Sequence, residues 1–452
     1  MKRQFLAPWM FSGDNHAIGL GRAIGAIESP KISWLIAIIL SVCLLIFTGC
    51  QSVINKNDGV IHLTLWHGIN PPPNRDIFQK LVDHFNQTHP DIQVEALYVG
   101  QADQQLPKIL TSIVGNAPPD ILWFAPMLTG QLVDLAAVKP LENWLNQSPL
   151  KSEIYPSLFE SMELNDHLWS VPMATNNVAV FYRPSLFKAA GISQTPKNWD
   201  EFRQVARQLT LDKNGDGKPE QYGMLLPLGK GEWTVFTWLP FLFSANGNLS
   251  ENGKPNINNP GAIRALNFWS NLLKDGSANL SAPERGYELD GFLKGNFAMQ
   301  LTGPWTLGQL QQTGVDFDVF AIPSDVKSAT VVGGENLFIM KSSPERENAA
   351  WQFFEYILGQ EFQTQWSLGT GYLPINMKAK TSPTYQSFIK KLPVLNVFLK
   401  QMEVARSRPL IAGYSRLSDN LGRAIEASLL GKPVEKSLEE AQARLDLIWE
   451  GK

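Results

Sequence analysis

The side chains whose spacing most directly suggests chemistry are acidic and amide oxygens within one short segment. Asp212, Asn214 and Asp216 alternate along the chain, as they do in the first half of a calcium-binding loop. Position twelve of such a loop would be Gly223, which cannot supply the bidentate glutamate that the site requires. We therefore interpret 212–220 as a tight polar turn, with a bound calcium ion as the alternative.

Other kinds of catalytic site find little support in the sequence. The pairs His62/His67 and His84/His89 are each spaced by five, which would place the first pair on opposite faces of a strand and argues against a metal site. The chain has 2 Cys, too few for a disulfide framework or a cysteine-built zinc site. Gly-x-Ser-x-Gly, His-Glu-x-x-His and Gly-x-x-x-x-Gly-Lys-Ser/Thr motifs are all absent. We expect a protein that is not an enzyme and needs no cofactor.

Composition narrows the class of protein further. The 452 residues are enough for two or three domains, and they are 44% hydrophobic and 18% charged with a net charge of -3. That balance excludes a disordered chain, and it shows no basic excess suited to nucleic acid. The 14 Trp and 24 Phe are a large aromatic stock, so some of these rings are candidates for ligand contact.

The first fifty residues resemble an export leader rather than part of a fold. Residues 34–47 form an uncharged apolar stretch of fourteen, short for a bilayer span of roughly 20 residues but suited to a signal peptide. The stretch ends in Thr-Gly-Cys50, which is similar to the lipidation site of bacterial lipoproteins, although Phe47 departs from the usual aliphatic residue. We expect 1–50 to be the leader and Cys50 to carry a lipid; an uncleaved signal anchor is the alternative. The exported body would be mildly acidic.

Strand-like and helix-like segments alternate after the leader, which indicates an α/β protein. The sequence predicts strands at 61–66, 92–98 and 120–124, separated by helices around 78–85 and 106–113. This order implies parallel strands, and ligands then favour their carboxyl ends. The residues at those ends are Trp66 and His67, Tyr98 and Gln101, and Trp123 and Phe124.

Capping residues mark three later helices. Asn198 is expected to cap a helix over 199–209, with Glu201 completing a capping box. Pro260 is expected to open another helix, because proline is favoured in the first turn. Ser437 and Glu440 are expected to form a second capping box before the final helix.

A series of motifs in collinear order over most of 60–450 resembles one family, the extracellular solute-binding proteins of ABC importers, in the group that binds maltose, oligosaccharides or glycerol 3-phosphate. The motifs that carry the resemblance are Gly115-Asn-Ala-Pro-Pro-Asp-Ile121, Trp169-Ser-Val-Pro172 with Val178-Ala-Val-Phe-Tyr-Arg183, Pro196-Lys-Asn-Trp-Asp-Glu-Phe202, Phe292-Leu-Lys-Gly-Asn-Phe-Ala-Met299 with Gly303-Pro-Trp305, Gly333-Gly-Glu-Asn336, Thr370-Gly-Tyr-Leu-Pro374 and Arg408-Pro409.

The resemblance implies a two-lobed α/β fold, with a hinge that the chain crosses several times and a ligand cleft between the lobes. We expect one lobe at 55–174 plus 330–372 and the other at 175–329 plus 373–452. It also implies a small-molecule solute, permease and ATPase subunits as partners, and a location in the cell envelope, anchored to the plasma membrane and facing the periplasm or exterior. No nucleic acid is expected as a partner.

A carbohydrate cleft needs flat aromatic surfaces for C–H faces and paired donors and acceptors for hydroxyl groups. We therefore predict a ligand site without catalytic residues. Its candidates are Trp66, His67, Asn70, Tyr98, Asn176, Asn177, Glu232, Trp233, Trp238, Trp305, Gly334, Glu335, Asn336, Tyr372 and Arg416. The rings expected to be core instead are Trp199, Trp269, Trp351 and Trp366.

Several of these candidates have a structural alternative. Trp66 ends a predicted strand and fits the core as well as the cleft. Gly333 and Gly334 permit close backbone approach at a hinge, or only a turn. Tyr372 and Arg416 are similar to residues of the glycerol-phosphate-binding members, so that an anionic solute stays open.

We favour a neutral carbohydrate or glycoside as the solute, with glycerol 3-phosphate or a glycerophosphodiester as the alternative. A glycan hydrolase is the alternative of another class, and it would need two carboxylates on either side of the bond that breaks. A structural or adhesion lipoprotein is a further alternative, and it would bind no small solute.

Overall fold

The computed structural model describes residues 59–228, 231–282, 289–411 and 413–450. The predicted leader, Cys50 and the expected start of the first lobe at residue 55 lie outside these residues. From Val60 onward the chain forms one compact unit. Among the described helices, none combines the length and the apolar character that crossing a bilayer requires.

The first sheet contains the strands predicted early in the sequence. Its order is β2 (Ile92–Tyr98), β1 (Ile61–His67), β3 (Ile121–Phe124), β15 (Asn336–Ile339) and β6 (Val171–Pro172). β1 runs parallel to both β2 and β3, as predicted, whereas β15 is antiparallel to β3 and β6. The buried apolar residues of β1, such as Leu63 and Leu65, explain why it is a central strand.

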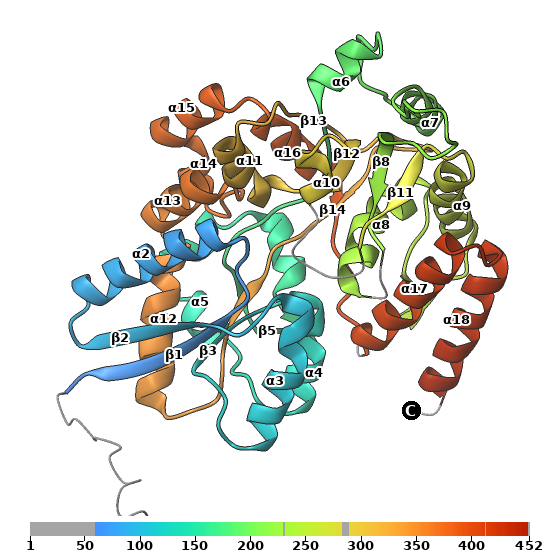
Figure 1. The fold of residues 1–452 in the computed structure, drawn as a ribbon. Helices are drawn as coiled ribbons and strands as arrows, with labels where there is room; N and C mark the ends of the chain where they lie inside the picture. The colour runs from blue at the N-terminus through green and yellow to red at the C-terminus, as the bar shows by residue number, and fades with distance from the viewer. Residues whose placement is uncertain (1–58, 229–230, 283–288, 412, 451–452) are drawn as a thin grey trace, which may run out of the picture. The chain divides into compact units, whose positions relative to one another are not determined.

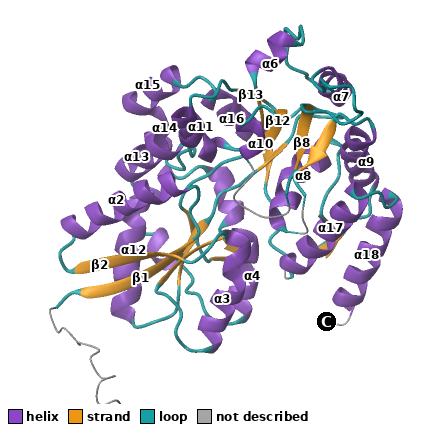
Figure 2. Ribbon diagram, in the orientation of Figure 1, coloured by secondary structure: helices purple, strands orange, loops and turns teal. Residues whose placement is uncertain are grey.

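Helices cover this sheet and share its core (Figures 1 and 2). They are α2 (Pro72–Thr88), α3 (Ala102–Val114), α4 (Thr129–Asp134), α5 (Glu142–Leu145), α12 (Pro344–Leu358) and α13 (Gln360–Thr370). The predicted helices around 78–85 and 106–113 are confirmed as parts of α2 and α3. Phe78 and Phe85 of α2 are fully buried because their spacing of seven puts them on the face toward the sheet.

The second sheet is built from the middle of the chain. Its order is β11 (Ala278–Leu280), β8 (Tyr222–Leu226), β12 (Phe297–Thr302), β7 (Ala179–Tyr182) and β13 (Asp318–Phe320). The helices that share its main core are α7 (Trp199–Gln208), α8 (Glu232–Ser244), α9 (Pro260–Lys274), α17 (Tyr414–Leu429) and α18 (Val434–Glu450). α17 packs against α8 and α9, so the last part of the chain completes this second core (Figure 1).

The remaining regular elements are short. The helices are α6 (Pro184–Ala189), α10 (Asp290–Leu293), α11 (Leu307–Thr313), α14 (Met377–Thr381), α15 (Pro383–Lys391) and α16 (Leu395–Gln401). The strand pairs are β4 (Glu163–Leu164) with β5 (His167–Leu168), β9 (Ser250–Glu251) with β10 (Lys254–Pro255), and β14 (Thr330–Val331) with β16 (Ala405–Arg406). The 3-10 helices are η1 (Pro126–Leu128), η2 (Pro149–Glu153), η3 (Pro156–Ser161), η4 (Pro304–Thr306) and η5 (Met402–Val404).

The predicted helix starts have mixed outcomes. Asn198 caps α7 by accepting from the Glu201 backbone N–H at 2.9 Å, as expected, but the Glu201 carboxylate accepts from the N–H of Lys197 rather than from that of Asn198. α9 does begin at Pro260. The capping box at Ser437 is wrong, because α18 starts at Val434 and the Ser437 hydroxyl donates back to the carbonyl of Pro433 within the helix.

Three chain segments pass side by side between the two sheets. Asn176, on the way from β6 to β7, exchanges backbone hydrogen bonds of 3.1 and 2.8 Å with Gly333. Its neighbour Thr175 exchanges bonds of 3.2 and 3.0 Å with Leu373, which follows α13. These three segments form the hinge of a two-lobed fold, and we call them the crossing segments.

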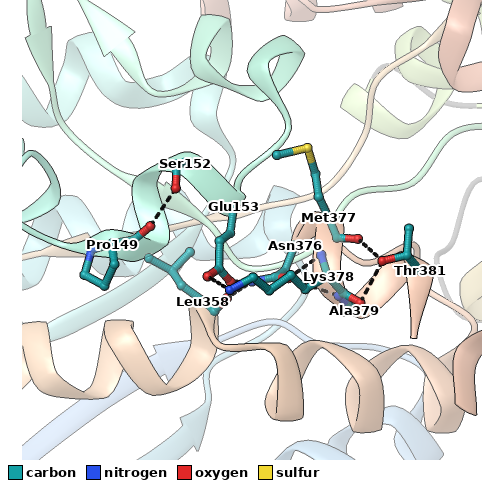
Figure 3. A network of polar contacts seen from close by, with 9 residues as sticks. All are labelled: Pro149, Ser152, Glu153, Leu358, Asn376, Met377, Lys378, Ala379 and Thr381. Carbon is teal, nitrogen blue, oxygen red and sulfur yellow. Dashed lines mark hydrogen bonds and ion pairs between the residues drawn. The ribbon is translucent and has the colours of Figure 1, made fainter. Parts of the chain in front are cut away.

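The third crossing segment ends at a buried asparagine (Figure 3). The Asn376 amide donates to Glu153 and to the carbonyl of Leu358, each at 2.9 Å, while its oxygen caps α14 by accepting from the backbone of Lys378 and Ala379. Every polar atom of this buried side chain is therefore satisfied. The contacts fasten the segment to the end of α12 and to η2.

Candidate functional site

A pocket lies where the crossing segments meet the carboxyl ends of β1, β2 and β3. It is open to solvent, and the empty space within it, the solvent-facing part included, is about 820 Å³. Eight of the sequence-predicted residues line it, namely Asn70, Asn176, Glu232, Trp233, Trp305, Gly334, Glu335 and Tyr372. These residues come from parts of the chain as distant as β1 and α13, and the fold brings them together.

Aromatic rings form much of the pocket wall. The Trp305 ring lies 6.1 Å from that of Trp233 in an edge-on arrangement and 6.3 Å from that of Tyr372. A Cβ atom on Gly303 would lie 1.9 Å from the Trp305 ring, so only glycine lets the indole fold back over the chain there. The Asn74 amide of α2 donates to the Trp305 carbonyl at 3.3 Å, which holds this segment against the first sheet.

The crossing segments supply the polar edge of the pocket. The side-chain oxygen of Asn176 is buried and accepts no hydrogen bond from the described residues. Gly334 has φ of +115°, and a Cβ there would lie 2.4 Å from the carbonyl of Ala174, so the second crossing segment can pass the first only as glycine. An acceptor in a pocket wall that has no protein partner suits a hydroxyl group from a ligand.

Glu232 is held by a cluster of donors at the start of α8. Its Oε1 accepts from Arg408 at 2.8 Å and from the Tyr414 hydroxyl at 3.0 Å, and its Oε2 accepts from the Ser418 hydroxyl. The guanidinium of Arg408 also lies 4.9 Å from the centre of the Phe236 ring. Both carboxylate oxygens of Glu232 are therefore engaged by the protein.

Glu335 lies in a different electrostatic setting. Burial raises the pKa of its carboxyl group to about 7, an effect that the positive charge of Arg408 partly offsets. Burial, together with the charge of Glu335, raises the pKa of Tyr372 well above its ordinary value. Among the described residues, none donates a hydrogen bond to the Glu335 carboxylate.

Three predicted residues at strand ends lie outside the pocket. Trp66 packs against the small core that contains Leu122 and Phe124. His67 is buried, with its ring 5.3 Å from that of Phe78. Tyr98 is 41% exposed, and the guanidinium of Arg75 lies 4.2 Å from its ring centre.

Four further candidates lie outside the pocket, three of them buried in the fold and one at the surface. The fully buried Trp238 belongs to the second core, and Asn177 donates to the carbonyl of Phe398 at 2.9 Å. Asn336, in β15 of the first sheet, donates to the hydroxyl of Ser170 at 2.8 Å. Arg416 lies exposed on α17, away from the pocket. The rings predicted to be core, Trp199, Trp269, Trp351 and Trp366, do belong to the two main cores.

The buried His67 makes the stability of the fold depend on pH. Burial, and to a smaller extent the charge of Arg75, lowers the pKa of His67 from 6.5 to about 4. Between these values the unfolded chain binds the proton more readily than the folded chain, so this histidine's contribution to stability falls as pH falls from about 6.5 to about 4. We expect His67→Gln to remove that contribution, as measured by thermal unfolding of residues 51–452 between pH 7 and pH 4.5.

The raised pKa of Glu335 changes stability with pH in the opposite direction, because the folded state holds that proton more tightly than the unfolded chain does. The quantity to compare is therefore the difference in melting temperature between variant and parent at each pH. His84→Gln, at an exposed position of α2, is the matched control and should leave the difference constant. A His67→Gln difference that is the same at pH 7 and pH 4.5 would contradict the expected linkage.

The acidic segment at 212–220 forms a hydrogen-bonded turn. Asp212 accepts from the backbone N–H groups of Gly215 and Gly217 at 2.7 and 2.8 Å. The carboxylates that lie within 4.8 Å of one another are those of Asp212, Asp216 and Glu220. All three are exposed, and their geometry matches the polar turn that the sequence favours.

Eight pocket residues were absent from the predicted list of ligand contacts. They are Gly68, Gln101, Trp123, Ala125, Met127, Phe236, Gly333 and Arg408. The sequence placed Gln101 and Trp123 at strand ends that favour ligands, but they were not listed as contacts. Phe236 lies one helical turn beyond Trp233, so helical spacing would have found it. Arg408 reaches the pocket only because β16 pairs with β14, a contact between residues more than seventy positions apart.

Comparison with known proteins gives a consistent picture. A maltotriose-binding protein of Pyrococcus abyssi is 23% identical over 359 residues, covering 77% of this chain and 73% of the relative. The sn-glycerol-3-phosphate-binding periplasmic protein of Salmonella paratyphi A is 23% identical over 358 residues, covering 76% and 81%. In fold, the chain is similar to the cyclic α-maltosyl-1,6-maltose-binding protein of Arthrobacter globiformis, with a TM-score of 0.74 and 24% identity over 87% of this chain and 100% of that one.

The family model for bacterial extracellular solute-binding proteins matches residues 80–391, which is more than half of the chain. That span includes the second sheet, every strand of the first sheet except β1, the three crossing segments and all but three of the residues that line the pocket, Gly68, Asn70 and Arg408. The sequence motifs, the two-lobed fold and this match agree, and the chain therefore belongs to the bacterial extracellular solute-binding proteins and is an exported protein.

Proposed function

We propose that this chain is the substrate-binding component of an ABC importer and that it captures a carbohydrate or glycoside outside the membrane. The observation that carries the proposal is the pocket wall, where the rings of Trp233, Trp305 and Tyr372 line the same pocket as Asn176, whose side-chain oxygen accepts from none of the described residues. Rings of this kind stack on the C–H faces of a sugar, and the oxygen accepts from one of its hydroxyl groups.

The charges in the pocket favour a carbohydrate over glycerol 3-phosphate. A phosphate group needs cationic donors, and Arg408, the one cation among the described residues that line the pocket, is already paired with Glu232 at 2.8 Å. Glu335 adds a second carboxylate beside it. The predicted role of Arg416 in binding an anion is not supported by its exposed position on α17.

A hydrolase of the two-carboxylate type is the alternative in another class. It would require one carboxylate free to act as base or nucleophile in addition to a proton-donating acid. Glu335 has the raised pKa expected of an acid, but both oxygens of Glu232 accept hydrogen bonds from protein side chains. The engaged state of Glu232 supports binding without catalysis.

The experiment is a binding panel on residues 51–452, which include the whole compact unit. Maltotriose, maltose, cellobiose, monosaccharides and glycerol phosphates are added at millimolar concentration, and the melting temperature is recorded. We expect at least one sugar to raise it by linkage and to be recovered intact. No shift with any solute would reject the proposal, and hydrolysis of a chromogenic glycoside would favour the enzyme.

Delivery to the importer belongs to the same proposal. The permease and ATPase subunits would be separate chains, and a lipid on Cys50 would anchor the body to the plasma membrane. We propose the lobe boundaries given above, 55–174 plus 330–372 and 175–329 plus 373–452, as the units that close over the solute. Metabolic labelling with a fatty-acid analogue, absent from a Cys50→Ser variant, would test the anchor.

A further inference from the structure

Among the described residues that line the pocket, Glu232, Glu335 and Arg408 are charged, and the two carboxylates differ in how many hydrogen-bond donors they have. Arg408 donates to Glu232 at 2.8 Å, and Tyr414 and Ser418 add hydroxyl donors, so the charge of Glu232 is balanced within the protein. Glu335 receives no hydrogen bond from the described residues, although it lines the same pocket. Among the described residues of the chain, none therefore donates directly to this second carboxylate.

Aromatic rings line the same pocket as this carboxylate. Trp233, Trp305 and Tyr372 lie in sequence along the wall with centres 6.1 and 6.3 Å apart, and Phe236 and Trp123 also line the pocket. The faces of such rings attract cations, most strongly in a desolvated site. Rings and an unpartnered carboxylate in one cavity are the combination that stabilises an ammonium group.

We propose that the solute of this pocket carries an ammonium group, and that Glu335 is its counter-ion and the residue that determines this specificity. This inference rests on the proposed function, since it concerns the same solute site. The class is a hydroxylated small molecule with a cationic nitrogen: an amino sugar, or a glycerol-based solute with a quaternary ammonium group. A phosphate at the same position is disfavoured by Glu335.

The groups that face Glu335 agree with this assignment. Arg408, from the segment after β16, is close enough to act on it electrostatically, yet its guanidinium is held by Glu232. Tyr372 lies at the start of the third crossing segment, and the charge of Glu335 contributes to raising its pKa. The carboxyl group of Glu335 has a pKa of about 7 without solute, so an ammonium ligand should bind with release of a proton below pH 7 and more tightly as pH rises to 8.

The test compares solutes that differ at one position, by calorimetry at pH 8 on residues 51–452. Glucose, 6-amino-6-deoxyglucose and glucose 6-phosphate carry a neutral, cationic and anionic group on the same ring, and glycerol 3-phosphate is compared with glycerophosphocholine. We expect the ammonium member of at least one series to bind at least tenfold more tightly than its counterparts. The series that responds distinguishes a sugar amine from a quaternary ammonium.

Glu335→Gln should reduce the ratio of affinities between the ammonium solute and its counterparts to about one, because it weakens the binding of the ammonium solutes only. Glu347→Gln is the matched control, since Glu347 is a buried glutamate that pairs with Lys139 outside the pocket. Unfolding without ligand checks that both variants are folded. Equal binding of neutral and ammonium members, or a preference that survives in Glu335→Gln, would overturn the inference and leave the proposed function standing. Binding of none of these solutes would overturn the inference. If the carbohydrate panel also gave no shift in melting temperature, the proposed function would be overturned as well.

Discussion

Replacing Trp305 by alanine should weaken solute binding by about 2–3 kcal/mol, or roughly 30- to 150-fold. The ring is packed between Trp233 and Tyr372 and touches the apolar cores of both sheets, so its removal takes away the central aromatic surface of the pocket. Calorimetry with whichever solute the binding panel identifies would measure the loss. Trp305→Phe should keep part of the affinity, because a flat ring remains.

Trp144→Ala is the matched control for this experiment. Trp144 is also partly buried and stacked on another ring, Trp351 at 6.0 Å, but it lies outside the pocket. Both alanine variants should lower the melting temperature through lost packing. Only Trp305→Ala should also lower the affinity, and equal affinities in the two variants would remove Trp305 from the solute site.

Replacing Asp120 by alanine should lower the free energy of unfolding by about 3 kcal/mol, because it removes a buried carboxylate that accepts an ion pair and a backbone hydrogen bond. Asp120 accepts two bonds of 2.7 Å from the Arg346 guanidinium of α12 and one of 2.8 Å from the backbone of Thr64 in β1. One carboxylate therefore joins β1, the start of β3 and α12. Denaturant unfolding of residues 51–452 would measure the change.

The control for Asp120 is a paired aspartate at the surface. Asp419 and Arg423 form an ion pair of 2.9 Å on α17 with both side chains about half exposed, and such pairs contribute at most about 1 kcal/mol. Asp419→Ala should thus change stability little. If the two substitutions had equal effects, the network at Asp120 would be no stronger than a surface ion pair.

Much of the fold could be predicted because its signals are local. The alternation of apolar strands and helices placed β1, β2 and β3 within a residue or two of their positions and gave their parallel order. The failure at Ser437 has a local cause too. A serine followed three residues later by a glutamate resembles a capping box, but here the helix had already begun after Pro433.

The candidate site could be predicted only in part, because a pocket depends on which face a side chain occupies. On α8, Trp233 and Phe236 are three residues apart and line the pocket together, whereas Trp238, five residues from Trp233, faces the core. Helical spacing explains this outcome once the bounds of α8 are known. The sequence showed the aromatic residues but not where the helix begins.

The sequence by itself determined the family, the order of the early strands and helices, and a set of residues of which eight line one pocket. The tertiary structure decided which strand-end tryptophan joins them. Trp66 of β1 is paired in register with Leu122 of β3, and both contribute to the same small core, while the next residue, Trp123, points to the other face and lines the pocket. Neighbouring side chains of a strand alternate between faces, so the register between strands, which no local pattern encodes, selects Trp123 over Trp66. Pairing of distant segments likewise brings Arg408 to Glu232, and no hydrogen-bond donor among the described residues reaches the Glu335 carboxylate.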